Sequence, residues 1–236
     1  MKLFPRLRRY GILVLVGTFL PLMACASEHI GYSAYHDYRI VEVVDGLERP
    51  WSIAFLPSGE MLVTEKPGRL RVVRDGQLSE PVSGLPEIYA EGQAGLLDVV
   101  PHPDFESNRL LYLSYSKPLG DGASTTAVIR GRFEGDSLSG VEEIFEAQSR
   151  GRGHYGSRLV FDDDGYLFIT VGDRQASASG DLEAHPAQDL SNHHGVVVRL
   201  HDDGRIPDDN PFVDTDGALP EIWTYGHRNA QGMARN

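Results

Sequence analysis

The sequence predicts an all-β protein of the β-propeller class, in which four-stranded sheets are arranged around a shared centre. Two observations carry this prediction. From Val41 onward, short runs rich in β-branched and aromatic residues are separated by Gly, Pro and Asp turns, and few stretches show helical periodicity. One pattern also recurs, with a small-residue start, an apolar strand, a Pro/Asp/Gly turn and a second apolar strand. Repetition of such a unit is typical of propeller blades.

The recurring pattern occurs at 51–65, 95–115 and 157–171. Gly59 in the first copy and Gly165 in the third are separated by two periods of about 53 residues, close to the length of a blade. Evenly spaced hairpins also occur in β-sandwiches, so a sandwich remains the alternative fold.

A fourth start of the pattern stands at the end of the sequence. Residues 228–234 align with residues 49–55, and the sequence stops at Asn236. Propellers close with about four to eight blades, and about three blades plus a stub would leave strand edges uncovered. We therefore expect an incomplete propeller from the N-terminal part of a longer protein. Closure by another chain is the alternative.

The first 26 residues have the layout of an export signal. A basic stretch (residues 2–9) precedes an apolar run (11–24), which ends in the small residues Ala24-Cys25-Ala26. Two processing routes fit this ending. One is cleavage after Ala26, and the other is a lipobox-like site that would make Cys25 a lipid anchor.

This layout leads to a domain organisation and a location. We expect a signal peptide over 1–26, an N-terminal linker over 27–40 and a partial propeller over 41–236. We also expect a periplasmic or otherwise extracytoplasmic protein, either free or anchored to the membrane through Cys25.

Charge and cysteine content exclude several functions. The chain has 34 acidic and 22 basic residues, for a net charge of −12. Such an acidic body argues against nucleic acid as a partner, since binding phosphates needs clustered Lys and Arg. One cysteine excludes an internal disulfide framework and a zinc site with several Cys ligands.

His154 and Asp173 are the first candidates for catalysis. His154 lies in a glycine-flanked loop before an apolar strand, and Asp173 follows the next strand. In an antiparallel hairpin these two positions reach the same end, where Asp173 can hold the His154 ring for work as a general base. The alternative is a loop histidine beside a turn aspartate without a chemical role.

Arg228, Asn229 and Gln93 are the candidates for binding. Arg228 and Asn229 lie between glycines, in a pattern that suits a planar polar ligand. Gln93 begins the second repeat and is expected to face the same centre. The oxygen-rich segment 208–217 could hold Ca²⁺, but it lacks the spacing of an EF-hand and its Glu at position twelve, and no residue is assigned as a metal ligand.

Six motifs together resemble the glucose/sorbosone dehydrogenase family, which includes soluble aldose sugar dehydrogenases dependent on pyrroloquinoline quinone (PQQ). They are, in order, residues 49–55, 91–97, 154–161, 169–173, 204–212 and 225–232. The resemblance implies a six-bladed propeller that oxidises an aldose at C1 to the lactone. It also implies PQQ as the hydride acceptor and an external electron acceptor.

The resemblance assigns roles to the candidate residues. His154 matches the general base, Asp173 its orienting partner, Arg228 and Asn229 the contacts to the quinone, and Gln93 a contact on the sugar side. Further cofactor contacts and most Ca²⁺ ligands of the family lie on later blades, so we expect little PQQ-dependent activity from these 236 residues. Two alternatives stay open. One is a non-catalytic extracytoplasmic propeller that binds a sugar or a partner, and the other is a metal-dependent lactonase-type propeller.

Overall fold

The computed structural model of the chain describes residues 29–235, which fall into two compact units that divide after Glu42. In the first unit, β1 (His29–Tyr32) and β2 (Asp37–Ile40) form an antiparallel hairpin. The segment predicted as a linker therefore contains a hairpin. The predicted signal segment, including Cys25, lies outside the described residues.

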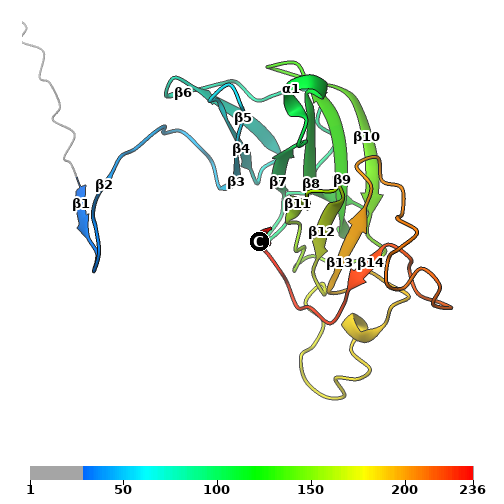
Figure 1. Ribbon diagram of the computed structural model, residues 1–236. Coiled ribbons are helices and arrows are strands. Elements are labelled where there is room, and N and C mark those ends of the chain that lie inside the picture. The colour runs from blue at the N-terminus through cyan, green and yellow to red at the C-terminus, as the bar shows by residue number, and fades with distance from the viewer. Residues whose placement is uncertain (1–28, 236) are drawn as a thin grey trace, which may run out of the picture. The chain divides into compact units, whose positions relative to one another are not determined.

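The second unit contains three four-stranded antiparallel sheets, each formed by strands consecutive in the chain (Figure 1). We call them blades 1, 2 and 3. Blade 1 consists of β3 (Pro50–Phe55), β4 (Met61–Glu65), β5 (Arg69–Arg74) and β6 (Gln77–Leu78). Blade 2 consists of β7 (Leu96–Pro101), β8 (Leu110–Pro118), β9 (Ser124–Phe133) and β10 (Leu138–Glu146). Blade 3 consists of β11 (Leu159–Phe161), β12 (Leu167–Val171), β13 (Val196–Leu200) and β14 (Ile222–Thr224).

These blades confirm the predicted all-β fold class. The two apolar runs in each copy of the sequence pattern are the first two strands of each blade. In the part of the chain that the structure describes, helical structure is limited to α1 (Phe105–Asn108) and the short 3-10 helix η1 (Pro186–Gln188). Within residues 29–235, no helix is long and apolar enough to cross a membrane.

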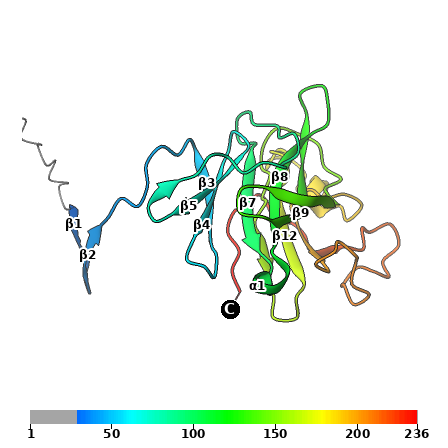
Figure 2. The ribbon, with the colours of Figure 1, turned by 90° about the horizontal axis from the view of Figure 1, so that it is seen from above.

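The first strands of the blades lie next to one another, β3 against β7 and β7 against β11, as Figures 1 and 2 show. One buried carboxylate joins all three. Asp98 in β7 accepts a hydrogen bond from Ser52 in β3 (2.5 Å) and another from Arg158, just before β11 (2.9 Å). The Arg158 guanidinium also stacks 4.7 Å from the ring of Trp51. The inner edges of the blades are therefore connected by polar contacts as well as by packing.

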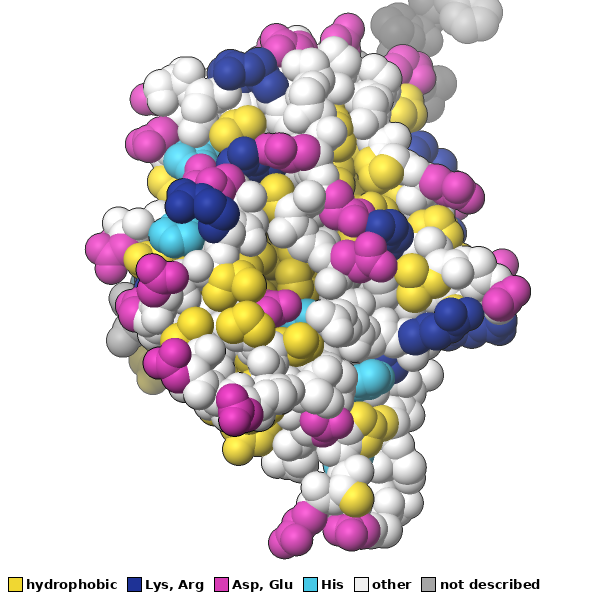
Figure 3. Space-filling view, turned by 90° about the vertical axis from the view of Figure 1, so that its right-hand side faces the viewer, with side chains coloured by type: hydrophobic (Ala, Val, Ile, Leu, Met, Phe, Trp, Pro, Cys, Tyr) yellow, Lys and Arg dark blue, Asp and Glu magenta, His cyan; other side chains and the backbone are white. Residues whose placement is uncertain are grey.

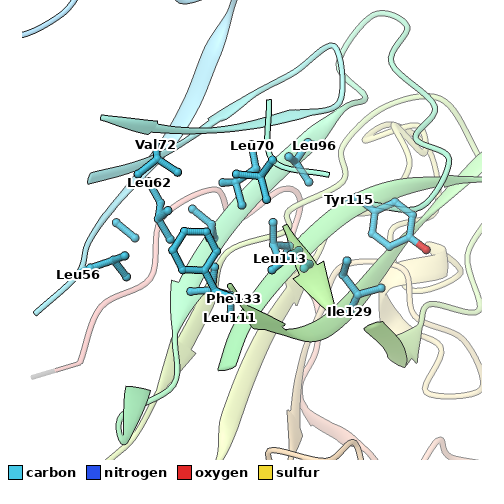
Figure 4. Packing of buried hydrophobic residues seen from close by; sticks show 14 of the residues in the cluster. Leu56, Leu62, Leu70, Val72, Leu96, Leu111, Leu113, Tyr115, Ile129 and Phe133 are labelled. Atoms are coloured by element: carbon cyan, nitrogen blue, oxygen red, sulfur yellow. The ribbon is translucent and has the colours of Figure 1, made fainter. Parts of the chain in front are cut away.

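Apolar layers fill the spaces between blades. The layer between blades 1 and 2 is drawn in Figure 4 and includes Leu62, Leu70, Leu96, Leu113 and Phe133, all nearly inaccessible to solvent. A second layer joins blades 2 and 3 and includes Tyr112, Val128, Leu159, Ile169 and Val198. Because these side chains are buried only when neighbouring blades meet, the near-continuous apolar runs of the inner strands favour both the blade and its stacking.

The C-terminal segment, red in Figure 1, has no regular secondary structure between β14 and Arg235. Its backbone is nevertheless held in place. The carbonyl of Ala230 accepts a hydrogen bond from Thr170, and that of Gln231 accepts one from Arg158. The segment that the sequence predicts to begin a fourth blade is therefore docked on blade 3, without a strand ladder among the described residues.

The surface is mixed in charge. On the face in Figure 3, acidic side chains are more plentiful than basic ones, and the two kinds are interspersed around hydrophobic side chains. This pattern agrees with the net charge of −12.

Candidate active site

His154 and Asp173 meet at one end of blade 3. Strands β11 and β12 pair with Leu159 opposite Ile169, so the start of β11 and the end of β12 lie together. His154 stands before the first strand and Asp173 after the second. Nδ1 of His154 lies 2.5 Å from Oδ1 of Asp173, and the two side chains are only 7% and 1% exposed.

The partner of Nδ1 determines the tautomer of this imidazole. A carboxylate oxygen only accepts hydrogen bonds, so Nδ1 carries the hydrogen and donates it. The same Oδ1 also accepts a hydrogen bond from the backbone N–H of Gln175 at 2.9 Å. In the neutral ring, Nε2 is then the free proton acceptor, with no hydrogen-bond partner among residues 29–235. A proton taken up at Nε2 creates an imidazolium that the Asp173 carboxylate stabilises.

The loop that carries His154 has an uncommon backbone conformation. His154 (φ 47°) and Ser157 (φ 75°) are left-handed, and Gly156 between them is also left-handed (φ 64°). This conformation costs a non-glycine residue on the order of 1 kcal/mol, so the surrounding structure must hold it. Such strain at a buried histidine is typical of a functional site.

Two of the predicted binding residues hold this loop. The amide oxygen of Gln93 accepts a hydrogen bond from the backbone N–H of His154 (2.8 Å). The amide oxygen of Asn229 accepts one from the backbone N–H of Gly156 (2.9 Å). In both side chains the oxygen is used within the protein, which leaves the NH₂ group to donate to a ligand.

Arg228 lies on the other side of the histidine–aspartate pair. Its backbone carbonyl accepts a hydrogen bond from the N–H of Asp173 (2.8 Å). Its exposed side chain lines a cavity of about 180 Å³ together with Asp173, His185, Gln188 and His227. The structure thus brings all five predicted site residues to one end of blade 3.

The cavity beside Asp173 contains a second histidine. Nδ1 of His185 accepts a hydrogen bond from the N–H of Ala187 (3.1 Å), so its hydrogen is on Nε2, which lies 3.9 Å from Oδ2 of Asp173. Small-molecule sites usually have volumes of about 300–1,000 Å³. At about 180 Å³, the cavity beside Asp173 is smaller than this range.

Two residues near the site were not found by sequence reasoning. Arg174 follows Asp173 directly, and its guanidinium is buried against the His154 loop. Only its adjacency to Asp173 could have indicated it. His185 comes from the long connection between β12 and β13, and no feature of the sequence links it to Asp173.

Metal ligands are not gathered in the described part of the chain. Within residues 29–235, no group of three or more His, Cys, Asp or Glu side chains could hold a metal ion. In the oxygen-rich segment 208–217, Asp209 pairs with Arg199 (2.9 Å), and the Asn210 amide donates to the carbonyls of Arg199 and Pro220. These contacts give the segment a structural use.

Comparison with known proteins places the chain in a family. The family described as Glucose / Sorbosone dehydrogenase matches residues 47–236. The chain belongs to this family. It is 45% identical over 226 residues to aldose sugar dehydrogenase YliI of Escherichia coli K12, covering 92% of this chain and 58% of that protein.

More distant members of the glucose/sorbosone dehydrogenase family have the same fold. The PQQ-bound form of aldose sugar dehydrogenase from Streptomyces coelicolor superimposes with a TM-score of 0.66 at 26% identity, covering 79% of this chain and 53% of that one. Quinoprotein glucose dehydrogenase B of Acinetobacter calcoaceticus is 30% identical over 215 residues, covering 81% of this chain and 45% of that protein. The chain thus spans about half the length of the curated relatives it matches.

Proposed function

We propose that the chain carries the proton-abstracting part of a PQQ-dependent aldose dehydrogenase site, which oxidises the C1 hydroxyl of a sugar to the lactone. The observation that carries this proposal is the buried pair of His154 and Asp173, joined at 2.5 Å beside the cavity that Arg228 lines. The names of the E. coli and S. coelicolor relatives support the choice of aldose and PQQ.

Arg228 at the cavity and Asn229 beside the His154 loop offer donors that suit an anionic quinone. Arg228 brings a guanidinium that is always charged, and the Asn229 amide has a free NH₂ group, so both can donate to quinone oxygens or carboxylates. When bound, PQQ would supply the two-electron acceptor for the hydride that leaves C1. The cavity is smaller than the usual small-molecule site, and the chain spans 58% of the E. coli relative, so we expect further cofactor contacts from outside this chain.

Residues of this chain would remove the proton of the C1 hydroxyl. Nε2 of His154 takes the proton of the C1 hydroxyl as the carbon–hydrogen bond breaks and the C1–oxygen double bond forms. Asp173 keeps the ring in the tautomer that exposes Nε2, and its charge stabilises the imidazolium. Gln93 fixes the backbone of His154 through its oxygen and keeps its NH₂ group for a sugar oxygen.

Other parts of the proposal rest on the sequence and the resemblance. They are an exported location, with or without a lipid anchor at Cys25, an external electron acceptor, and Ca²⁺ held by ligands outside the described residues. The sugar itself is left open, because the residues that would contact it are only partly on this chain.

The test uses a fusion of residues 1–236 to the C-terminal part of the E. coli relative that this chain does not cover. After loading with PQQ and Ca²⁺, addition of an aldose is expected to change the visible spectrum of the bound cofactor. Replacement His154→Gln is expected to slow this change by about a hundredfold or more, since a general base contributes about 10²–10⁴-fold. His36→Gln, in the exposed β1–β2 turn, is the matched control.

The alternatives give different results in the same assay. A non-catalytic propeller would bind sugar or a partner without any spectral change in the fusion. A lactonase would hydrolyse a lactone with added metal and without PQQ. Either result, or an unchanged rate in the His154→Gln fusion, would remove the proposal. The isolated 236-residue chain is expected to show little turnover.

A further inference from the structure

Arg174 places a buried cation directly beneath the His154 loop. Arg174 is 8% exposed, and its Nη1 donates a hydrogen bond to the backbone carbonyl of His154 (2.7 Å). Its Nη2 donates to the hydroxyl of Thr126 in β9 (2.7 Å). The guanidinium also lies 4.9 Å from the ring of Tyr155. Among residues 29–235, no carboxylate forms an ion pair with it.

Such a placement is unfavourable for folding. Transfer of a guanidinium from water into the protein interior carries a large desolvation cost, which a paired carboxylate usually offsets. Here burial lowers the pKa of Arg174 to about 10, so the group is still charged at neutral pH. Its Nε–H has no hydrogen-bond partner in the described structure, and its backbone is left-handed (φ 56°). These costs indicate that the hydrogen bonds of the Arg174 side chain serve the site.

The two Nη groups hold two successive peptide units of the loop. Nη1 binds the His154 carbonyl directly. The Thr126 hydroxyl, which accepts from Nη2, itself donates to the carbonyl of Tyr155 (2.8 Å). The forked guanidinium therefore fixes the orientation of both carbonyls, and with them the left-handed turn that aims the imidazole at Asp173. A lysine has one ammonium group on a flexible stem and cannot make both contacts in this geometry.

We propose that Arg174 is a positioning residue, whose forked contact with the His154 loop keeps Nδ1 of His154 bound to the carboxylate of Asp173. Its meaning for catalysis rests on the function proposed above, whereas the positioning itself does not. The competing explanation is that Arg174 only fills space, since it packs against Tyr155 and Gly151.

The test observes the His154–Asp173 hydrogen bond itself in the full chain. A proton in a short hydrogen bond between imidazole and carboxylate gives a far-downfield resonance in proton NMR, and the His154→Gln variant identifies it by its loss. In Arg174→Lys and Arg174→Met we expect this proton to exchange with solvent about tenfold faster or more, or to disappear, since hydrogen bonds to charged groups are among the stronger ones in proteins. Both variants fill similar space, so a space-filling role predicts little change.

Arg152→Met is the matched control. Arg152 belongs to the same loop and also donates to a backbone carbonyl, that of Gly122 (2.7 Å), but it is exposed and does not contact His154. Its replacement is expected to leave the resonance unchanged. Thr126→Val keeps the shape of the side chain in β9 and removes one end of the fork. It is expected to weaken the resonance less than Arg174→Met does, and it carries the test if the Arg174 variants fail to fold.

The outcomes separate this inference from the proposed function. A resonance that stays unchanged in folded Arg174→Lys and Arg174→Met, or in Thr126→Val where those variants do not fold, overturns the positioning role. That result would not contradict the proposed function, because sugar oxidation by the fusion is tested separately. A resonance that responds as expected supports the positioning role even if the fusion shows no sugar oxidation.

Discussion

Gly172 stands directly against the backbone carbonyl of His154. A Cβ atom built on Gly172 would lie 1.9 Å from that oxygen, far inside the closest approach of real atoms. Because Gly172 immediately precedes Asp173, the bare backbone at 172 is what lets the aspartate come within hydrogen-bond distance of the imidazole. The lack of a side chain at Gly172 is therefore required for the observed positions of His154 and Asp173.

We expect Gly172→Ala to displace the His154 loop and to lower the rate of cofactor reduction in the fusion. Misplacement of a reacting group by about 1 Å costs on the order of a hundredfold in rate. The His154–Asp173 proton resonance reports the displacement directly. Gly232→Ala is the matched control, since a Cβ atom at Gly232 meets no atom within 4 Å. An alanine at 172 that leaves both the resonance and the rate unchanged would show that the loop adapts freely.

Asp98 connects the three blades at their inner edges, and its loss is expected to loosen them. Its carboxylate accepts hydrogen bonds from Ser52, Arg158 and the backbone N–H of Leu159 (2.8 Å). Asp98→Ala leaves these donors without an acceptor in a buried place. Because the Arg158 side chain is 27% exposed, the expected loss of stability is about 1–3 kcal/mol, the cost of leaving buried donors without an acceptor. Denaturant unfolding of the chain measures this loss.

Asp163→Ala is the control for this prediction. Asp163 also pairs with an arginine, Arg235, but its side chain is 82% exposed. Exposed ion pairs contribute about 0–1 kcal/mol, so this variant is expected to unfold near the wild-type midpoint. Equal effects of the two replacements would show that the blades do not depend on the Asp98 contacts.

The fold was readable from the sequence because each blade repeats the same local chemistry. The apolar runs around Gly59 and Gly165 are short and rich in β-branched and aromatic residues, and the turns between them contain Gly, Pro or Asp. The hairpin of residues 29–40 was not predicted. Each of its strands has only four residues, so the alternation of Ile30 with Tyr32 and of Tyr38 with Ile40 is too short to identify a strand, and these four side chains are exposed.

The site was readable only in part. Adjacent strands bring His154 and Asp173 together, and hairpin geometry alone predicts that contact. The use of Gln93 and Asn229 to hold the loop backbone is different, because it depends on φ values at His154 and Gly156 that no residue pattern specifies. Both side chains were expected to face a ligand. In the fold, the amide oxygen of each accepts a hydrogen bond from the loop backbone instead.

Glu65 is expected to make the chain sensitive to acid. This buried carboxylate accepts hydrogen bonds from Arg69 (2.7 Å), from Arg71 (3.3 Å) and from the backbone N–H of Glu48. Burial opposes ionisation, but these donors outweigh it and lower the pKa of Glu65 below its usual 4.5. A carboxyl group with a lowered folded-state pKa stabilises the fold above its unfolded pKa, and this contribution is lost as the pH falls through the folded value.

The unfolding free energy is therefore expected to fall as the pH drops below about 4.5, and to fall less steeply in Glu65→Gln. Denaturant midpoints collected across this range give the slope. Glu80→Gln removes an exposed carboxylate of the same blade and serves as the comparison. If Glu65→Gln and wild type lose stability in parallel with acid, the donors around Glu65 do not favour its charged form.

Asn229 is expected to have two separable roles. Its oxygen accepts the hydrogen bond from the N–H of Gly156, and its NH₂ group is free for the cofactor. Asn229→Asp keeps an acceptor at this place and turns the donor into a negative charge, whereas Asn229→Leu removes both. We therefore expect the His154–Asp173 proton resonance to persist in the aspartate variant and to weaken in the leucine variant.

Cofactor binding is expected to depend on the NH₂ group of Asn229. PQQ carries carboxylates, so a negative charge at 229 opposes it, and the dissociation constant measured on the fusion is expected to rise in both variants. The increase is expected to be about tenfold or more, because a lost hydrogen bond to a charged group is worth about 1.5–3 kcal/mol. If Asn229→Asp bound PQQ as tightly as wild type, the amide would have no part in holding the cofactor, and its function would be confined to the loop.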